Sequence, residues 1–161
     1  MDSRRVVAIA ALALVAAGAV VLVFFPGLLV GDPGPYNTTT VTVADENGTD
    51  LATVEVRIAD TFEKRYTGLS ETDSLAPDEG MLFVHDEEGK HGYVMRGMDF
   101  PIDIVFVDGD GTVVDIFHAS VDGENAPYRA TAKYVLEVNR GWTNRTGLSA
   151  GDTVEIPNGV A

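Results

Sequence analysis

Three charged residues, Arg96, Asp103 and Glu137, stand beside apolar runs and are the first candidates for polar chemistry. Asp103 alternates with Val105 and Val107, so in a strand it shares their face and approaches the core, where a charge needs a partner. One interpretation is a ligand pocket in which Arg96 binds an anion. The other is an internal ion pair that holds the strands in register. Asp103 and Glu137 would also suit a general acid and base, although their spacing does not establish this.

Methionine and histidine side chains form a second group, with ligand atoms that suit a metal ion. His91, Met95 and Met98 have the spacing His-x3-Met-x2-Met, and Met81, His85 and His118 lie elsewhere in the chain. Thioether and imidazole ligands are suited to copper outside a cell. The alternative is that the methionines fill a core and the histidines lie at the surface. We expect the alternative, and we predict no metal site and no cofactor.

Aromatic side chains offer a third kind of site, a face on which a sugar or another small ligand stacks. Trp142 is the best candidate, because it follows Gly141 in the polar stretch 141–147. Aromatic residues pack in a core more often than they form a binding platform. Core packing is therefore the alternative for Trp142, as it is for Tyr93, Tyr128 and Tyr134.

Composition excludes several classes of function. The 161 residues include 25 Asp and Glu against 11 Lys and Arg, and this net charge of −14 repels the phosphates of nucleic acids. The absence of cysteine excludes disulfides, thiolate metal sites and a cysteine nucleophile. No metalloprotease, P-loop, dinucleotide-binding or G-x-S-x-G motif occurs. Abundant carboxylates with few lysines are typical of a halophilic protein, and they bear on solubility rather than on fold.

An apolar segment near the N-terminus has the length of a membrane-spanning helix. Val6–Phe25 contains no charged residue and is long enough to cross a bilayer core of about 30 Å. Arg4 and Arg5 precede the segment, so the positive-inside rule places the N-terminus in the cytoplasm and the C-terminal domain outside the cell. The alternative is a cleaved signal peptide with a small-residue site at 17–19. We expect an uncleaved, single-pass signal anchor in the cell membrane.

The rest of the chain divides into a linker and one folded domain. Residues 1–30 form the predicted anchor, residues 31–40 are rich in Pro, Gly and Thr and form the linker, and residues 41–157 form the domain. Three N-x-Ser/Thr sequons begin at Asn37, Asn47 and Asn144 in predicted linker or turn segments, so these are glycosylation candidates.

The domain has the pattern of mainly β structure with one short helix. Val41–Ala44 and Leu51–Ile58 flank an Asn-Gly turn and predict a β-hairpin. A capping-box pattern predicts a helix over Thr61–Thr67 that ends at Gly68. Further strands are predicted at 81–84, from 91, and at 101–108, 112–119, 133–139 and 153–156, with a charged turn at 86–90. This pattern predicts a compact, partly closed antiparallel β domain of the α+β class, preceded by the transmembrane helix.

Four segments together resemble domain-of-unknown-function family 192, also called uncharacterised protein family 0127. They are Thr61–Leu69, Gly80–Phe83, Tyr93–Asp108, and Val135–Val138 with Gly141, Gly151 and Asp152. In the third segment family members usually read Trp-Met-Lys-Asn-Thr before a Pro-Leu-Asp strand. Here Met95, Arg96, Pro101 and Asp103 match, whereas the Trp, Asn and Thr are replaced. The chain is similar to a haloarchaeal, membrane-anchored member, and the resemblance implies a compact β-rich fold, often exported, without implying an activity.

These observations predict a membrane-anchored extracytoplasmic domain that is a non-catalytic binding or accessory module. Its expected ligand is a small molecule or a cell-surface glycan. The candidate ligand-binding residues are Met95, Arg96, Asp103, Glu137 and Trp142. Two alternatives remain open: a hydrolase or other enzyme that uses the carboxylates of Asp103 and Glu137, and an extracytoplasmic copper binder.

Overall fold

The computed structural model describes residues 30–122 and 127–160. The fold below is that of the unit Pro33–Ala161. Within the described ranges, no helix has both the length and the apolar character that crossing a bilayer requires. The predicted transmembrane segment Val6–Phe25 lies outside these ranges.

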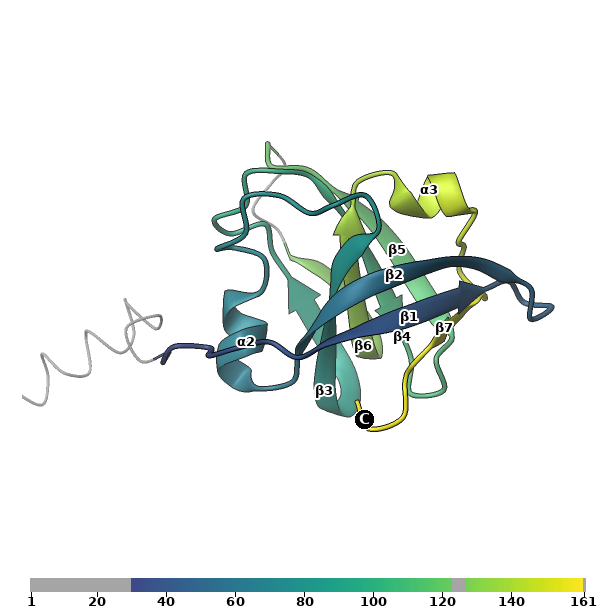
Figure 1. Cartoon of the computed structure of the whole chain (residues 1–161), viewed down its shortest axis with the longest axis horizontal. Coiled ribbons are helices and arrows are strands. Elements are labelled where there is room, and N and C mark those ends of the chain that lie inside the picture. Colours follow the sequence, from purple (N-terminus) through teal and green to yellow (C-terminus); the bar gives the residue numbers. More distant parts are fainter. Residues whose placement is uncertain (1–29, 123–126, 161) are drawn as a thin grey trace, which may run out of the picture. The chain divides into compact units, whose positions relative to one another are not determined.

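Seven strands of the described residues form one curled sheet (Figure 1), in the order β5-β4-β6-β3-β2-β1-β7. The strands are β1 (Thr38–Ala44), β2 (Asp50–Ala59), β3 (Glu79–Tyr93), β4 (Ile102–Val107), β5 (Val113–Ala119), β6 (Tyr128–Asn139) and β7 (Thr153–Glu155). Two short helices accompany them, α2 (Phe62–Thr67) and α3 (Trp142–Thr146). The domain is therefore mainly β, as its sequence pattern predicts.

The two edges of the sheet meet where β7 approaches the turn before β5. Val113 N donates a 2.8 Å hydrogen bond to Asp152 O, and Val154 N donates one of the same length to Gly111 O. A Cβ atom at position 111 would lie 2.8 Å from Val154 O, and Gly111 has a φ of 89°, so this close approach requires glycine. These contacts close the sheet in part.

The predicted hairpin is present, and the predicted strands 101–108 and 112–119 form a second one. β1 pairs with β2 through the Asn-Gly turn, where Gly48 has a φ of 81°. β4 pairs with β5, and the connecting turn is held by Asp108, whose carboxylate accepts the backbone N–H groups of Asp110 and Thr112. The carboxylate of Asp108 thus accepts hydrogen bonds that a backbone carbonyl would otherwise accept, which is a common reason for Asp at the first position of a turn.

The predicted helix is also present, and it connects two parallel strands. The hydroxyl of Thr61 accepts the backbone N–H of Lys64 at the start of α2, and Gly68 ends the helix with a φ of 52°. The chain then returns so that β3 runs parallel to β2, whereas the other neighbouring strands in the sheet are antiparallel. The prediction of an antiparallel domain needs this one correction.

The structure differs from the predicted element boundaries in four further places. The predicted strand at 81–84, turn at 86–90 and strand from 91 are one strand, β3, whose pairing with β6 shifts register between Val84 and Gly89. Residues 86–88 are exposed in this irregular part of the strand, so their charged side chains stay in contact with solvent. β6 begins at Tyr128, α3 occupies the polar stretch 141–147, and β1 begins at Thr38, within the predicted linker.

Alternating side chains build two cores, one on each face of the sheet. The first core includes Val105 of β4 and Leu136 of β6 and extends over β1, β2 and β7. The second core includes Ile104 and Val135 from the same two strands, and Leu69 packs against it. Each buried large aliphatic side chain contributes roughly 1.5–3 kcal/mol, so the two cores hold β4 and β6 firmly between them. The candidate site lies on the second face.

Candidate functional site

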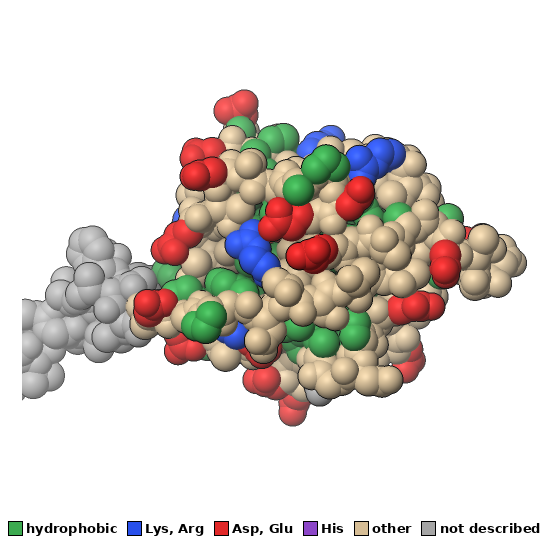
Figure 2. Space-filling model, viewed as in Figure 1, with side chains coloured by type: hydrophobic (Ala, Val, Ile, Leu, Met, Phe, Trp, Pro, Cys, Tyr) green, Lys and Arg blue, Asp and Glu red, His purple; other side chains and the backbone are tan. Residues whose placement is uncertain are grey.

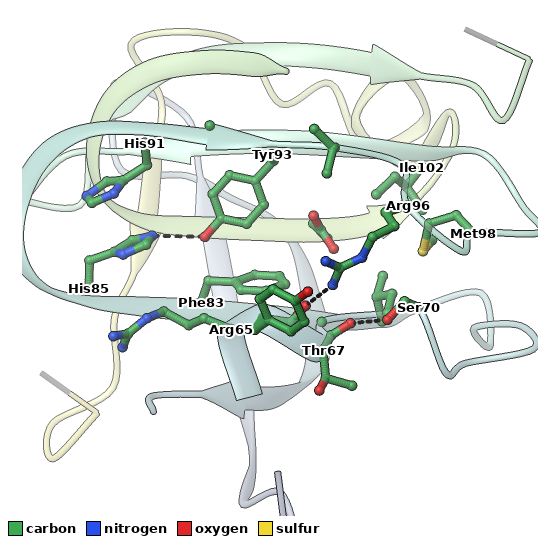
Figure 3. Close-up of a pocket in the computed structure, with 16 residues that line it drawn as sticks. Arg65, Thr67, Ser70, Phe83, His85, His91, Tyr93, Arg96, Met98 and Ile102 are labelled. Atoms are coloured by element: carbon green, nitrogen blue, oxygen red, sulfur yellow. Dashed lines mark hydrogen bonds between the residues drawn. The ribbon is translucent and has the colours of Figure 1, made fainter. Parts of the chain in front are cut away.

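A pocket of about 220 Å³ opens on the second face of the sheet. Figure 3 shows side chains from α2, from β3 and from the segment after β3 pointing into it. Arg65 and Thr67 come from α2, Tyr93 ends β3, and Arg96 and Met98 follow in the next segment. Gly97 has a φ of 66°, and this left-handed conformation turns the chain between Arg96 and Met98.

Glu137 lines this pocket from β6 and is almost fully buried, with 6% of the residue exposed. Its register partners are Met81 on β3 and Ile104 on β4, both 0% exposed, so apolar side chains flank it on both sides. No hydrogen bond or ion pair to its carboxyl group forms among the described residues. Burial therefore raises the pKa of Glu137 from 4.5 to about 8.

Arg96 is held at the pocket by contacts with Tyr66 of α2. Its Nη2 donates a 2.6 Å hydrogen bond to Tyr66 O, and its guanidinium carbon lies 4.0 Å from the centre of the Tyr66 ring. A guanidinium carries five N–H donors, so this anchoring leaves donors for another partner. Arg65, in contrast, donates from Nη1 to two backbone oxygens, those of Asp60 and Val84. Arg96 is the more accessible cation.

Two stacked histidines and Tyr93 form another wall of the pocket (Figure 3). The rings of His85 and His91 are parallel within 8°, with centroids 3.4 Å apart, and His85 Nε2 lies 2.9 Å from Tyr93 Oη. Burial, with repulsion from His91 and Arg65, lowers the pKa of His85 to about 4. Burial and the nearby Glu137 carboxyl raise the pKa of Tyr93. His85 and Tyr93 are therefore neutral around pH 7.

Asp103 lies on the opposite face, 0% exposed, and is saturated with hydrogen bonds. Its Oδ1 lies 2.7 Å from His118 Nδ1 and 3.6 Å from Arg140 Nε. Its Oδ2 accepts from Gly141 N at 3.0 Å, Thr143 N at 3.1 Å and Thr143 Oγ1 at 2.7 Å. Burial by itself raises the pKa of Asp103, but the hydrogen bonds from His118, Thr143 and Gly141 outweigh it and lower the pKa.

These contacts give Asp103 a structural role. Gly141 precedes α3 and supplies no side chain to cap it. The carboxylate of Asp103 instead satisfies the backbone N–H groups of Gly141 and Thr143 at the start of the helix. Of the two interpretations given for the charged residues, Asp103 has the contacts of the internal one, with partners inside the domain.

Trp142 lies in the first core, with 2% of the residue exposed. Its Nε1 donates a 3.1 Å hydrogen bond to Asp78 Oδ1, and Arg145 pairs with the same oxygen. The indole thus packs as the first residue of α3 and does not present its face to solvent. Trp142 therefore packs in the core, which was the alternative to a binding platform, and its indole nitrogen has a polar partner.

Of the five predicted ligand-binding residues, the structure brings Arg96 and Glu137 together in the pocket. Met95 packs against the second core beside it. Asp103 pairs with Val138 across β4 and β6, whereas Glu137 pairs with Ile104. Because successive residues point to opposite faces of a sheet, the carboxyl groups of Asp103 and Glu137 do not converge as an acid–base pair.

The methionine and histidine side chains do not form one cluster either. Met81 is 0% exposed in the second core, and His118 contacts Asp103 on the other face. His85, His91 and Met98 do line the pocket, but the parallel stacking of the two imidazoles does not aim their nitrogens at a common point. Within the described ranges no group of three or more His, Asp and Glu side chains is placed to hold a metal ion.

Several residues of the pocket were not among the candidates from the sequence, among them Arg65, Thr67, Ser70 and Phe83. They belong to segments singled out for their family resemblance or lie next to one, and that resemblance was the only signal available for them. Two other lining residues, Val94 and Met98, stand where family members usually have Trp and Thr. The wall of this pocket therefore carries some of the departures from the family pattern.

The three sequon asparagines, Asn37, Asn47 and Asn144, are exposed. Asn47 lies at the turn between β1 and β2, and Asn144 lies in α3. Their exposure satisfies the steric requirement for modification, and glycosylation remains a prediction.

Two solved structures share this fold. One is a candidate transcription regulator from Sinorhizobium meliloti 1021, with a TM-score of 0.71 and 31% identity over 78% of this chain and 97% of that chain. The other is a protein of unknown function from Novosphingobium aromaticivorans DSM 12444, with a TM-score of 0.70 and 29% identity over 79% of this chain and 91% of that chain.

Sequence comparison leads to the same family as the resemblance noted above. None of the curated proteins matches this chain. The family model of DUF192, described as an uncharacterised ACR, matches residues 42–156, which include all residues of the pocket. The chain therefore belongs to domain-of-unknown-function family 192.

Proposed function

We propose that the domain is a non-catalytic module that binds a small ligand in the pocket between α2, β3 and the segment after β3. One observation carries this proposal: Glu137 is buried at the pocket without a hydrogen-bond partner among the described residues, while the guanidinium of Arg96 lies on another wall. A buried polar group without a partner is costly. The Glu137 side chain lines the pocket, so a ligand that satisfies its carboxyl group would offset this cost, and this supports a binding role for the pocket.

The size and lining of the pocket favour binding over catalysis. Its volume of about 220 Å³ is below the range of roughly 300–1,000 Å³ that is usual for drug-sized ligands, so the ligand is small. Among the described residues that line the pocket, Glu137 is the only acid, whereas acid–base hydrolysis uses two carboxylates. A stacking site for a cell-surface glycan at Trp142 has no support, because the indole is 2% exposed.

We also propose that the domain is held outside the cytoplasmic membrane by the apolar segment Val6–Phe25. The length of this segment and the preceding arginines support the proposal. Acidic side chains are spread over the visible face of the domain (Figure 2), as expected for a protein soluble in high salt and unable to attract nucleic acid. Extraction of membranes with alkaline carbonate tests the anchor, and recovery of a shortened protein from the medium would contradict it.

The binding proposal is tested by a thermal-shift screen of small polar compounds on residues 33–161 in high salt. The relative from Sinorhizobium meliloti matches this domain over 97% of its own chain, so the domain folds on its own. A ligand of the native state raises the melting temperature. Each active compound is then measured against Glu137→Gln and Arg96→Met, with Arg129→Met as a matched control outside the pocket. We expect weaker binding in the first two variants alone; binding unaffected by both would contradict the proposal.

A further inference from the structure

Two charged groups of the pocket, Arg96 and Glu137, are available to a ligand. Arg65 is engaged with the backbone oxygens of Asp60 and Val84, and it also lies 3.9 Å from Asp86. Arg96 uses one N–H group on Tyr66 O and is otherwise exposed. Glu137 has no cation within ion-pair distance among the described residues. The pocket therefore offers donors at Arg96 and an acceptor at Glu137, without a direct contact between them.

This arrangement is more specific than a site for an anion alone. A pocket built only for an anion gains from a carboxyl group in its wall only while that group is protonated, because the ionised form would repel the ligand. A pocket built only for a cation gains nothing from a guanidinium anchored at 2.6 Å by Tyr66 O. A ligand that carries both signs of charge is complementary to both groups, and a carboxylate is a small anion whose two oxygens match the paired N–H donors of a guanidinium.

We propose that the pocket binds a small zwitterion of the amino-acid class, whose ammonium group pairs with Glu137 and whose carboxylate pairs with Arg96. This inference rests on the proposed function and names the chemistry of its ligand. The rings of Phe83 and Tyr93, which pack edge to face with centroids 4.9 Å apart, form an apolar wall for the rest of the ligand. The volume of about 220 Å³ accommodates one amino acid rather than a peptide.

Proton release accompanies such binding. The ammonium group favours the ionised form of Glu137 and lowers its pKa from about 8, so affinity rises with pH up to about 8. The other charged or titratable side chains on the pocket wall are Arg65, Tyr66, His85, His91, Tyr93 and Arg96. Since the pKa of His85 is about 4 and that of Tyr93 is raised, neither changes charge between pH 6 and 8. His91→Asn shows whether His91 contributes to the pH dependence.

Three probes that share the same branched four-carbon unit test the charge requirement: L-valine, isobutylamine and isovalerate. The first carries both groups, the second only the ammonium and the third only the carboxylate. We add 4-aminobutanoate as a zwitterion with a longer separation of the charges. Binding is measured by titration calorimetry on residues 33–161 in two buffers that differ in ionisation enthalpy, so that proton release is counted directly. Glu137→Gln and Arg96→Met are the test variants, and Glu55→Gln and Arg129→Met, exposed on β2 and β6, are their matched controls.

We expect a zwitterion to bind at least about tenfold more tightly than either single-charge probe, a difference of about 1.4 kcal/mol. We also expect proton release at pH 7, and about tenfold weaker binding in each test variant but not in the controls. Equal binding of isovalerate, with an affinity that falls as pH rises, would overturn the proposal in favour of a simple anion site. If no zwitterion binds while the thermal-shift screen finds another ligand in the pocket, the proposal is overturned and the proposed function stands. If the screen also finds none, both fail.

Discussion

Replacing Glu137 by glutamine should make the domain more stable, and increasingly so as the pH rises. Glutamine keeps the shape of the side chain and is neutral at every pH. The folded-state pKa of Glu137 is raised, so the wild-type carboxyl destabilises the fold progressively as pH rises from 4.5 toward about 8, and fully above that. Below pH 4.5 it is neutral in both folded and unfolded chains, and the two proteins should be similar in stability.

The magnitude follows from the pKa values. A change from 4.5 to about 8 corresponds to a free-energy difference of about 5 kcal/mol between the ends of this pH range. Water entering the pocket would reduce the difference, so this value is an upper bound. Because Glu137 is only 6% exposed, screening by bulk solvent does not remove the effect.

The assay is urea denaturation of residues 33–161 and of the variant at about pH 5, 7 and 9, at constant high salt. Constant salt matters because the acidic surface responds to ionic strength as well. Glu55→Gln, an exposed glutamate on β2, controls for the loss of one surface charge. A difference between wild type and Glu137→Gln that stays flat from pH 5 to 9, or a variant that is less stable at pH 9, would refute the burial of an unpaired carboxyl.

Further predictions concern Asp103, Gly80 and the acidic surface. Asp103→Ala should cost about 3–5 kcal/mol of unfolding free energy, and Asp103→Asn less, because an amide keeps an acceptor for Gly141 and Thr143; equal losses in urea titrations would contradict this. The lowered pKa of Asp103 means that its contribution is lost only below about pH 3.8, as an acid titration would show. Gly80→Ala should cost about 1–3 kcal/mol or more, because its Cβ would lie 2.5 Å from Glu137 O, whereas Gly89→Ala in the same strand should cost less. The melting temperature of the domain should rise from low to molar KCl, and a flat or falling curve would contradict the role assigned to its carboxylates.

Local signals predicted the hairpins and α2 well. Asn47-Gly48, Asp108 and Gly68 each specify a turn or helix end through their own backbone preference, and that preference acts within a few residues. The parallel pairing of β2 with β3 depends on contacts between distant segments, which no local pattern records. Helix α3 was missed for the same reason, because its start is satisfied by Asp103 from β4 rather than by a residue nearby.

The candidate site was predictable in part. Glu137 interrupts an apolar run, so strand alternation predicts that its side chain approaches a core. Arg96 was a candidate because it stands next to the apolar residue Met95. The partners of these residues were not predictable, because the pocket walls come from α2, β3 and the segment after it. Asp103 has the same sequence signature as Glu137, a charge within an apolar run. Only the strand register, which pairs Asp103 with Val138 and Glu137 with Ile104, assigns them to opposite faces.

The most direct test of the pocket as the binding site is an NMR titration of labelled residues 33–161 with each compound that the thermal-shift screen selects. The amides of Gly68 and Gly92 line the pocket, and the indole N–H of Trp142, the only tryptophan, reports on the opposite face. We predict that the Gly68 and Gly92 resonances shift with ligand concentration while the indole resonance does not. A screen without an active compound, or shifts centred on Trp142 with Gly68 and Gly92 unchanged, would contradict the account.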